Sequence, residues 1–321
     1  MEKKIKEIIE KAKSVVVLCH FNSDCDALGS AYAVTELLKN LGKKAVCCLE
    51  EEPERRLRFL GEDYVVYSGK AEYECDLCIA VDCGSIDRLG SRAEIFRSAK
   101  VTINIDHHKT NTYFADVNYV AGDLSATAEL LAVIFSECGY DITDRIAMLL
   151  YAGIMSDSGC FKYPSATPDT LRVVACLMEY DFDHAEVARL LFDSQPMELV
   201  KFKGHIMNNV QSIDGGRISL IETDSRMLKK YGVSESDAGD LINIPRQIEG
   251  VEIAIEVKER SGCVRLSLRS NGKAEVDRIA GKFGGGGHLR AAGATMTGMT
   301  PEEAREAVLE AAREELKRID K

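Results

Sequence analysis

The chain has 321 residues, 45% of them hydrophobic, and a formal net charge of −11 at pH 7. This length suits two domains, and the negative charge argues against a protein that coats long nucleic acid by neutralising its phosphates. No stretch approaches the roughly 18 consecutive apolar residues of a membrane span, and the charged start, Met1–Lys4, is not a secretory signal. Because the 11 cysteines are scattered through strand-like and helix-like stretches, we expect reduced thiols in a cytoplasmic protein that does not associate with membranes.

After a predicted helix at 2–13, the first predicted strand, residues 15–18, runs straight into a polar turn. His20, Asp24 and Asp26 lie in this turn, directly before a second predicted helix. Asp24 and Asp26 by themselves are typical helix N-cap residues. The imidazole four residues before Asp24 changes that interpretation, because one imidazole and two carboxylates within reach of a single point suit a divalent cation.

Two later strands, 77–81 and 101–105, also end in acids or histidines, and so does the apolar helical stretch 143–155. The polar residues that follow these three stretches are Asp82, Asp106, His107, His108 and Asp157. Because the carboxyl ends of parallel strands meet at one edge of an open sheet, we expect these side chains to converge. The other predicted elements of this half carry no obvious chemistry; they are strands 45–49 and 64–67 and helices 92–99, 124–138, 168–180 and 183–192.

From residue 217 onwards the hydrophobic pattern changes. Stretches 217–222, 251–258 and 264–269 alternate like strands of an antiparallel or mixed sheet, and two helices are predicted at 274–282 and 301–318. We therefore expect an α/β protein with three parts: a mostly parallel, doubly wound sheet domain at 1–185, a helical linker at 186–214 and a smaller α/β domain at 215–321.

Carboxylates gathered at one sheet edge repel one another unless cations offset them. Two divalent ions that share one carboxylate would do so, and the chemistry of such pairs is in-line displacement at phosphorus. Ligands drawn from Asp and His without Cys favour Mn²⁺, with Mg²⁺, Co²⁺ and Fe²⁺ as alternatives. In the second domain, the glycine run 284–287 presents unshielded amide groups to which His288, Arg269 and Arg290 can add donors for an anion, although such a run is also typical of a flexible turn.

The motifs resemble a known family when they are taken in chain order. His20-x3-Asp24-x-Asp26, Asp82, Asp106-His107-His108 and Asp157 resemble the four motifs of the DHH phosphoesterases. The run from Gly284 to His288 is similar to the signature of their type-1 DHH-associated C-terminal domain. The resemblance covers nearly the whole chain, and at this length it is greatest to the nanoRNase and pAp-phosphatase group. Cys25 departs from the pattern, since a small residue is common at that position.

The resemblance implies a role for each motif residue. His20, Asp24 and Asp82 would hold one metal ion, and the second ion would be held by Asp26, Asp82, His107 and Asp157, so that Asp82 bridges the two. His108 would point at the scissile phosphate and Asp106 would orient the histidines, which makes His108, Asp106 and Asp82 the expected catalytic residues. The residues expected to bind the nucleotide end are Arg269, Ser270, Gly285, Gly286, Gly287 and His288.

We therefore expect a metal-dependent phosphoesterase that hydrolyses short single-stranded oligonucleotides to nucleoside 5′-monophosphates and also acts on 3′-phosphoadenosine 5′-phosphate (pAp). The substrate is expected between the two domains, and an acidic surface without a basic track disfavours long strands and duplexes. The resemblance implies a homodimer. Two alternatives stay open: a phosphodiesterase for cyclic di-AMP or pApA with the same site, and a nucleotide-binding regulatory protein. An inorganic pyrophosphatase is disfavoured, because the glycine-rich loop belongs to the other type of C-terminal domain.

Overall fold

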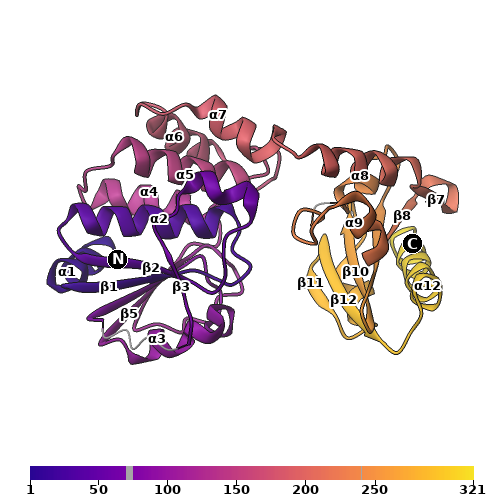
Figure 1. Ribbon diagram of the computed structural model, residues 1–321, viewed down its shortest axis with the longest axis horizontal. Helices are drawn as coiled ribbons and strands as arrows, with labels where there is room; N and C mark the ends of the chain where they lie inside the picture. The colour runs from indigo at the N-terminus through magenta and orange to yellow at the C-terminus, as the bar shows by residue number, and fades with distance from the viewer. Residues whose placement is uncertain (70–74, 240) are drawn as a thin grey trace. The chain divides into compact units, whose positions relative to one another are not determined.

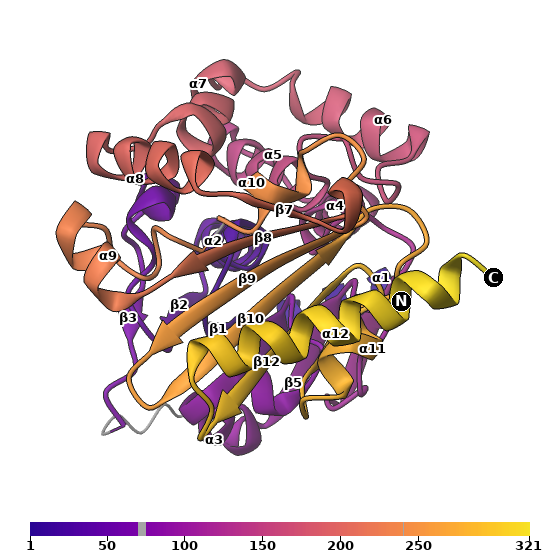
Figure 2. The ribbon, with the colours of Figure 1, turned by 90° about the vertical axis from the view of Figure 1, so that its right-hand side faces the viewer.

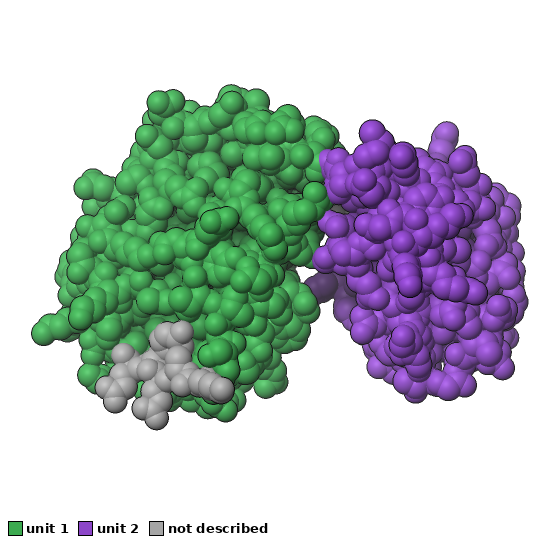
Figure 3. All heavy atoms as spheres, viewed as in Figure 1, with its two compact units in different colours: residues 1–194 green, residues 195–321 purple. Residues whose placement is uncertain are grey.

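The computed structural model describes residues 1–69, 75–239 and 241–321 of the chain. These residues form two compact units, Met1–Ser194 and Gln195–Lys321, shown in green and purple in Figure 3. The division falls inside the stretch 186–214, and helix α8 (Met197–Asn208) belongs to the second unit. The predicted α/β class is confirmed, since each unit combines helices with a six-stranded sheet.

A parallel sheet with the strand order β3-β2-β1-β4-β5-β6 organises the first unit (Figure 1). Its strands are β1 (Ser14–Leu18), β2 (Lys44–Leu49), β3 (Val65–Val66), β4 (Leu77–Val81), β5 (Val101–Asp106) and β6 (Val117–Val120). β1 lies between β2 and β4, with Val15 in register with Ala45 on one side and Leu77 on the other. The chain order reverses between β1 and β4, and open α/β sheets bind ligands at the carboxyl ends of the strands beside such a reversal.

Both faces of this sheet are covered, which explains the uninterrupted apolar runs of its central strands. Val15 and Val17 of β1 belong to the larger core, whereas Val16 and Leu18 belong to a separate core on the opposite face. Helices of the larger core are α1 (Glu2–Lys11), α2 (Cys25–Asn40), α4 (Thr127–Glu137), α5 (Asp144–Asp157), α6 (Pro168–Leu177) and α7 (His184–Ala188). The opposite face is covered by α3 (Ala93–Ser98) and the 3-10 turn η2 (Ile86–Arg92). Figure 1 shows α2, α4 and α5 on one side of the strands and α3 on the other.

A buried arginine ties the strand ends together at the edge where polar residues gather. The Arg92 side chain has no exposed surface and donates hydrogen bonds to the carbonyl oxygens of Cys19 (2.9 Å) and Cys48 (2.8 Å). Its Nε also lies 3.1 Å from a carboxylate oxygen of Glu50. Because Cys19 follows β1 and Cys48 lies near the end of β2, this guanidinium fixes the backbone from which His20 projects.

The second unit is built on a mixed sheet in the order β11-β12-β10-β9-β8-β7, where β8 and β9 are parallel and the other pairs are antiparallel. Its strands are β7 (Gln211–Ile213), β8 (Ile218–Thr223), β9 (Ile253–Arg260), β10 (Cys263–Ser270), β11 (Gly286–His288) and β12 (Ala291–Thr297). One face packs on α11 (Val276–Gly281) and α12 (Pro301–Ile319), and Figure 2 shows α12 running across the sheet. The remaining helices are α8, α9 (Ser225–Tyr231) and α10 (Asn243–Arg246).

The start of α12 and the glycine run of the second unit can be compared with their predictions. α12 begins where predicted, since the Thr300 hydroxyl accepts from the Glu303 N–H and Pro301 occupies the first turn. The glycine run, by contrast, ends in a strand, because Gly286, Gly287 and His288 pair with β12. Among the described residues, no helix combines the length and the apolar composition that crossing a bilayer requires.

Candidate metal centre

The acids and histidines singled out in the first half of the chain lie together at the carboxyl edge of the parallel sheet. His20 follows β1, Asp82 follows β4, and His107 follows β5, while Asp26 and Asp157 come from the first turn of α2 and the last turn of α5. Three groups of these side chains place their ligand atoms within 4.8 Å of one another: His20, Asp24 and Asp82; Asp26, His107 and Asp157; and Asp82, His107 and His108.

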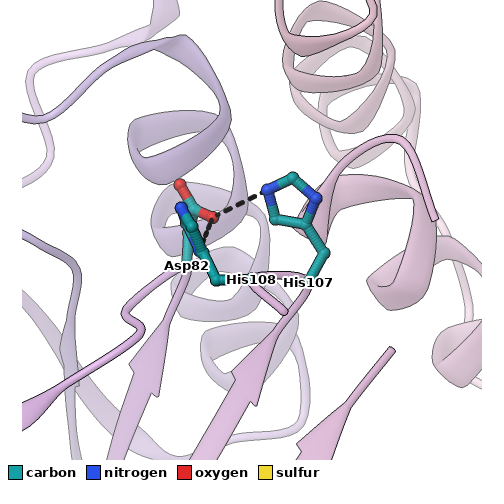
Figure 4. A group of neighbouring side chains, drawn as sticks. All are labelled: Asp82, His107 and His108. Atoms are coloured by element: carbon teal, nitrogen blue, oxygen red, sulfur yellow. Dashed lines mark ion pairs between the residues drawn. The ribbon is translucent and has the colours of Figure 1, made fainter. Parts of the chain in front are cut away.

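Asp82 is the residue that connects these groups. One of its carboxylate oxygens lies 3.5 Å from His20 Nε2, and the other lies 3.5 Å from His107 Nε2. Figure 4 shows the carboxylate facing the imidazoles of His107 and His108. The backbone of Asp82 has a φ of 52°, in the left-handed region that costs a non-glycine residue about 1–3 kcal/mol. Its N–H donates to the Ile105 carbonyl at 3.0 Å, so pairing with β5 holds the residue in this conformation.

His20 and Asp24 form the first group with Asp82. The Asp24 side chain caps α2 by accepting from the Ala27 N–H, and its other oxygen lies 3.7 Å from His20 Nε2. In the second group, His107 Nε2 lies 3.4 Å from Asp157 and 4.0 Å from Asp26. The opposite ring nitrogen of His107 lies 3.3 Å from the Leu124 carbonyl, which orients the ring toward the carboxylates.

The N-terminus of α4 holds two of the carboxylates, which the sequence analysis missed. The N–H groups of Thr127 and Ala128 donate to the two oxygens of Asp26 at 2.7 and 2.9 Å. The Thr127 hydroxyl donates to Asp82 at 2.9 Å, and Thr127 itself is fully buried. Asp26 therefore lies at the positive end of a helix dipole. No signal in the sequence distinguishes Thr127 from any other residue in the first turn of a helix.

His108 differs from the other two histidines in its hydrogen bond. Its Nδ1 lies 2.7 Å from the Asp106 carboxylate, which is fully buried and also accepts from Asn111. The hydrogen bond to Asp106 raises the pKa of His108 to about 9. Since Nδ1 is engaged in this way, Nε2 is the ring nitrogen left for another partner. The Asp106 carboxylate therefore holds one edge of the His108 ring in place.

The pKa values show how strongly charge is crowded at this edge. Burial disfavours the charge on His20, but hydrogen bonds to Asp24 and Asp82 outweigh it and raise its pKa to about 11. Burial also raises the pKa of Asp157 to about 6. Burial and the charges of Asp82 and Asp157 raise the pKa of Asp26 well above its ordinary range. Protons thus offset the repulsion among carboxylates wherever no other cation does so.

The donor set fits divalent cations. Oxygen and nitrogen atoms converge from separate elements, and no cysteine of the described chain joins the three groups, so Cys25 of α2 is not among the donors. Hard to borderline metals prefer carboxylate and imidazole ligands of this kind. Because Asp82 faces both outer groups, the geometry suits two ions that share one carboxylate.

The residues predicted to bind a nucleotide end lie in the second unit. His288 of β11 pairs with Ala291 of β12, which in turn pairs with Arg269 of β10, so the three positions lie side by side across the sheet. Ser270 is buried and its hydroxyl donates to the Ala274 carbonyl at 2.7 Å. The glycines serve close strand packing: a Cβ at Gly285 would lie 2.2 Å from the Gly293 carbonyl oxygen.

Comparison with known proteins agrees with this arrangement. Residues 14–154 match the N-terminal domain of the DHH family, and residues 222–318 match the DHHA1 domain. The bifunctional oligoribonuclease and PAP phosphatase NrnA of Thermus thermophilus is 34% identical over 98% of this chain and 94% of its own length. The protein of the same name from Bacillus subtilis is 28% identical over 92% of this chain and 93% of its own length.

A solved structure shares the fold. The crystal structure of an exopolyphosphatase-related protein from Bacteroides fragilis matches with a TM-score of 0.93 at 24% identity, covering 100% of this chain and 97% of that one. In this chain, the region that matches the DHH domain contains the parallel sheet, and the region that matches the DHHA1 domain contains most of the mixed sheet. With its clustered acids and histidines at the edge of the first sheet and its glycine-rich strand in the second, the chain belongs to the DHH family of phosphoesterases.

Proposed function

We propose that this protein is a metal-dependent phosphoesterase that hydrolyses short oligonucleotides to nucleoside 5′-monophosphates and also hydrolyses pAp. The observation that carries the proposal is the Asp82 carboxylate, whose two oxygens face two separate groups of potential ligands. The similarity over nearly the whole chain to proteins named as oligoribonucleases and PAP phosphatases supports the substrate class.

In this proposal, His20, Asp24 and Asp82 hold one divalent ion, and the second is held by Asp26, Asp82, His107 and Asp157. Mn²⁺ is the first choice for both, because the donors are carboxylates and imidazoles. When bound, the two ions activate water for attack at phosphorus and neutralise charge on the phosphate. The protein contributes ligands fixed before substrate arrives, since Thr127 and the N–H groups of α4 already hold Asp26 and Asp82.

His108, held by Asp106, acts on the phosphate rather than on the ions. Asp106 accepts a hydrogen bond from the Nδ1–H of His108, which fixes the ring and leaves Nε2 to donate to a non-bridging phosphate oxygen. A raised pKa keeps His108 protonated at neutral pH. A charged donor aimed at the phosphate stabilises the negative charge that develops there in the transition state.

The second unit would hold the end of the nucleotide chain. We assign this role to the set predicted from the sequence, namely Arg269, Ser270, Gly285, Gly286, Gly287 and His288. Arg269 and His288 are neighbours across β12, so both can approach one anion. We also propose a homodimer, to be tested by light scattering, and a cytoplasmic location, which the free state of all the described cysteines supports.

A length series tests the function. Purified protein with Mn²⁺ is given 5′-labelled RNAs of increasing length, beside pAp and cyclic di-AMP. We expect kcat/KM to peak for linear chains of about two to four residues, a range set by a limited anion-binding span.

Each contrary outcome is distinct. Equal efficiency on a strand of about 24 residues, which needs many more phosphate contacts, would identify a processive nuclease instead. A clear preference for cyclic di-AMP would identify a second-messenger phosphodiesterase. If no substrate is hydrolysed with Mn²⁺, Mg²⁺ or Co²⁺, the protein is a nucleotide-binding regulatory protein rather than an enzyme.

A further inference from the structure

A basic groove lies on the sheet of the second unit, on the face opposite α12. It has a volume of about 590 Å³ and is lined by β9, β10, β12 and the start of the glycine run. Its charged lining residues are Glu235, Lys258, Arg260 and Arg265. The net charge of the chain, −11, gives no hint of this groove.

The register of the strands brings two cations directly opposite each other. Arg265 of β10 pairs with Lys258 of β9, and both side chains leave the sheet on the face opposite the Leu266 core contact. Like charges in directly opposed positions destabilise a sheet. Thr295 of β12 is the other neighbour of Arg265 and supplies a hydroxyl to the same groove.

Only part of this positive charge is balanced within the unit. Lys258 Nζ lies 3.1 Å from Glu256, a buried carboxylate below it, and Arg260 lies 2.9 Å from Glu235. Arg265 is exposed and makes no hydrogen bond or ion pair with any residue in the described ranges 1–69, 75–239 and 241–321. One guanidinium in a concave site is therefore ready to bind an anion.

The groove shares Gly285 with the set assigned to the nucleotide end, but its lining does not include Arg269 or His288. Arg265 and Arg269 lie on the same face of β10, four residues apart, which corresponds to about 13 Å at the rise of a β-strand. One phosphate group cannot span that distance. The cations of this face thus form a line that starts at Arg269 and His288 and continues along β10 into the groove.

We propose that this groove, through Arg265 and Lys258, binds a second backbone phosphate of a linear oligonucleotide, farther from the chain end than the phosphate held near Arg269 and His288. The proposal rests on the proposed function and extends it from one anion site to two. A second site would strengthen binding of chains of three or more residues but not of pAp, which is too short to reach both sites.

The test uses the full-length protein and three variants. Arg265→Gln removes the unpaired charge, Arg265→Lys retains it, and Lys317→Gln makes the same charge change at an exposed position on α12, which packs on the other face of the sheet. Since Arg265 has no partner in the described chain and lies opposite a like charge, Arg265→Gln should unfold at or slightly above the wild-type temperature. KM and kcat are measured for pAp and for RNAs of two to five residues, at low and moderate salt.

We expect Arg265→Gln to raise KM for tetra- and pentanucleotides about 5- to 10-fold. The slope of log KM against log salt concentration should fall by about 1, the change expected when one phosphate contact is lost. KM for pAp and kcat for all substrates should stay within about 2-fold, as expected when only one distant phosphate contact is lost. Arg265→Lys and Lys317→Gln should resemble the wild type. An unchanged KM at every length, or an equal rise in KM for pAp, would overturn the proposal.

A binding assay separates this proposal from the proposed function. Fluorescence anisotropy with 5′-labelled di- and tetranucleotides is measured in the presence of chelator, where hydrolysis does not interfere. If the wild type binds the tetranucleotide more tightly and Arg265→Gln abolishes the difference, the groove is a phosphate site even if no hydrolysis is found. If both proteins bind both lengths equally, the groove proposal fails while hydrolysis of pAp and dinucleotides still supports the function.

Discussion

The two regions that carry the proposed function are built in opposite ways. At the edge of the parallel sheet, the charged groups are buried and fixed: Asp26 and Asp106 have 1% and 0% of their surface exposed, and each accepts hydrogen bonds from neighbouring elements. On the sheet of the second unit, Arg265 and His288 are exposed and Arg265 has no partner in the described chain.

The difference follows from what each region has to do. Chemistry at phosphorus requires charges placed before the reaction, because a preorganised dipole needs no rearrangement in the transition state. Buried carboxylates are unfavourable unless cations and hydrogen bonds compensate them, so such a site must be held by many contacts. Holding an oligonucleotide requires only cations and amides at suitable spacing, and solvent-exposed contacts of this kind are weak singly. We therefore expect large effects from changes in the first region and modest, length-dependent effects in the second.

Asp82→Ala should have the largest effect, because the residue faces both ligand groups. We expect the rate to fall by more than about 10³-fold, beyond the effect of losing a single transition-state donor. Elemental analysis should find close to two ions per chain in the wild type and fewer in the variant. Asp123→Ala, at a side chain that is 99% exposed, is the matched control and should be fully active. A fully active Asp82→Ala enzyme would exclude the shared-carboxylate mechanism.

A pair of histidine variants compares the regions directly. His108→Ala should lower kcat by about 10²-fold, because it removes a donor to the reacting phosphate. His288→Ala should raise KM with little change in kcat, since it affects binding of the substrate end. Steady-state kinetics on a dinucleotide distinguish the two. If His288→Ala leaves KM unchanged for every substrate, the glycine-rich strand has only a structural role.

The sequence predicted features that depend on local residues. The polar positions after β1, β4 and β5 could be found because buried strands end abruptly in acids and histidines, and the start of α12 could be found because Thr300 and Pro301 form a local signal. What it could not predict depends on distant residues. Asp82 adopts a positive φ because of its pairing with β5, and the basic groove arises because β9 and β10 align Lys258 with Arg265.

Thr127 is the clearest example of a residue that sequence reasoning missed, and its variants sharpen the account of the buried region. Thr127→Val keeps the shape but removes the hydroxyl that donates to Asp82. We expect about a 10- to 100-fold loss of metal affinity or activity, as is typical when a group that orients a ligand is removed. Thr127→Ser restores the donor and should recover most of the loss. Calorimetric titration with Mn²⁺ gives a readout that does not depend on turnover, and equal affinity in Thr127→Val would show that Asp82 needs no such support.

The smallest effect we expect is the pH dependence of Tm in protein from which metal has been removed. It tests whether protons replace metal cations among the buried carboxylates of the first unit. In chelated protein, the pKa of Asp157 is raised to about 6, that of His108 to about 9 and that of His20 to about 11. A group whose pKa is raised by folding stabilises the protein fully below its unfolded pKa, and this contribution disappears as the pH rises through the folded pKa.

All three shifts make the folded protein less stable as the pH rises. The shift of Asp157 acts between about pH 4 and 6, and the shifts of the two histidines act above about pH 6.5, the ordinary pKa of His. Tm of the chelated protein should therefore fall between pH 6 and 9, by a shift on the order of 5 °C. Added Mn²⁺ should raise Tm more at pH 8 than at pH 6, because fewer protons compete for the ligands. His20→Asn lacks the imidazole with the largest shift, so its chelated form should show a shallower fall. If Tm of the chelated wild type rises over the same range, the carboxylates are compensated by something other than protons, and the buried region does not depend on cations as we describe.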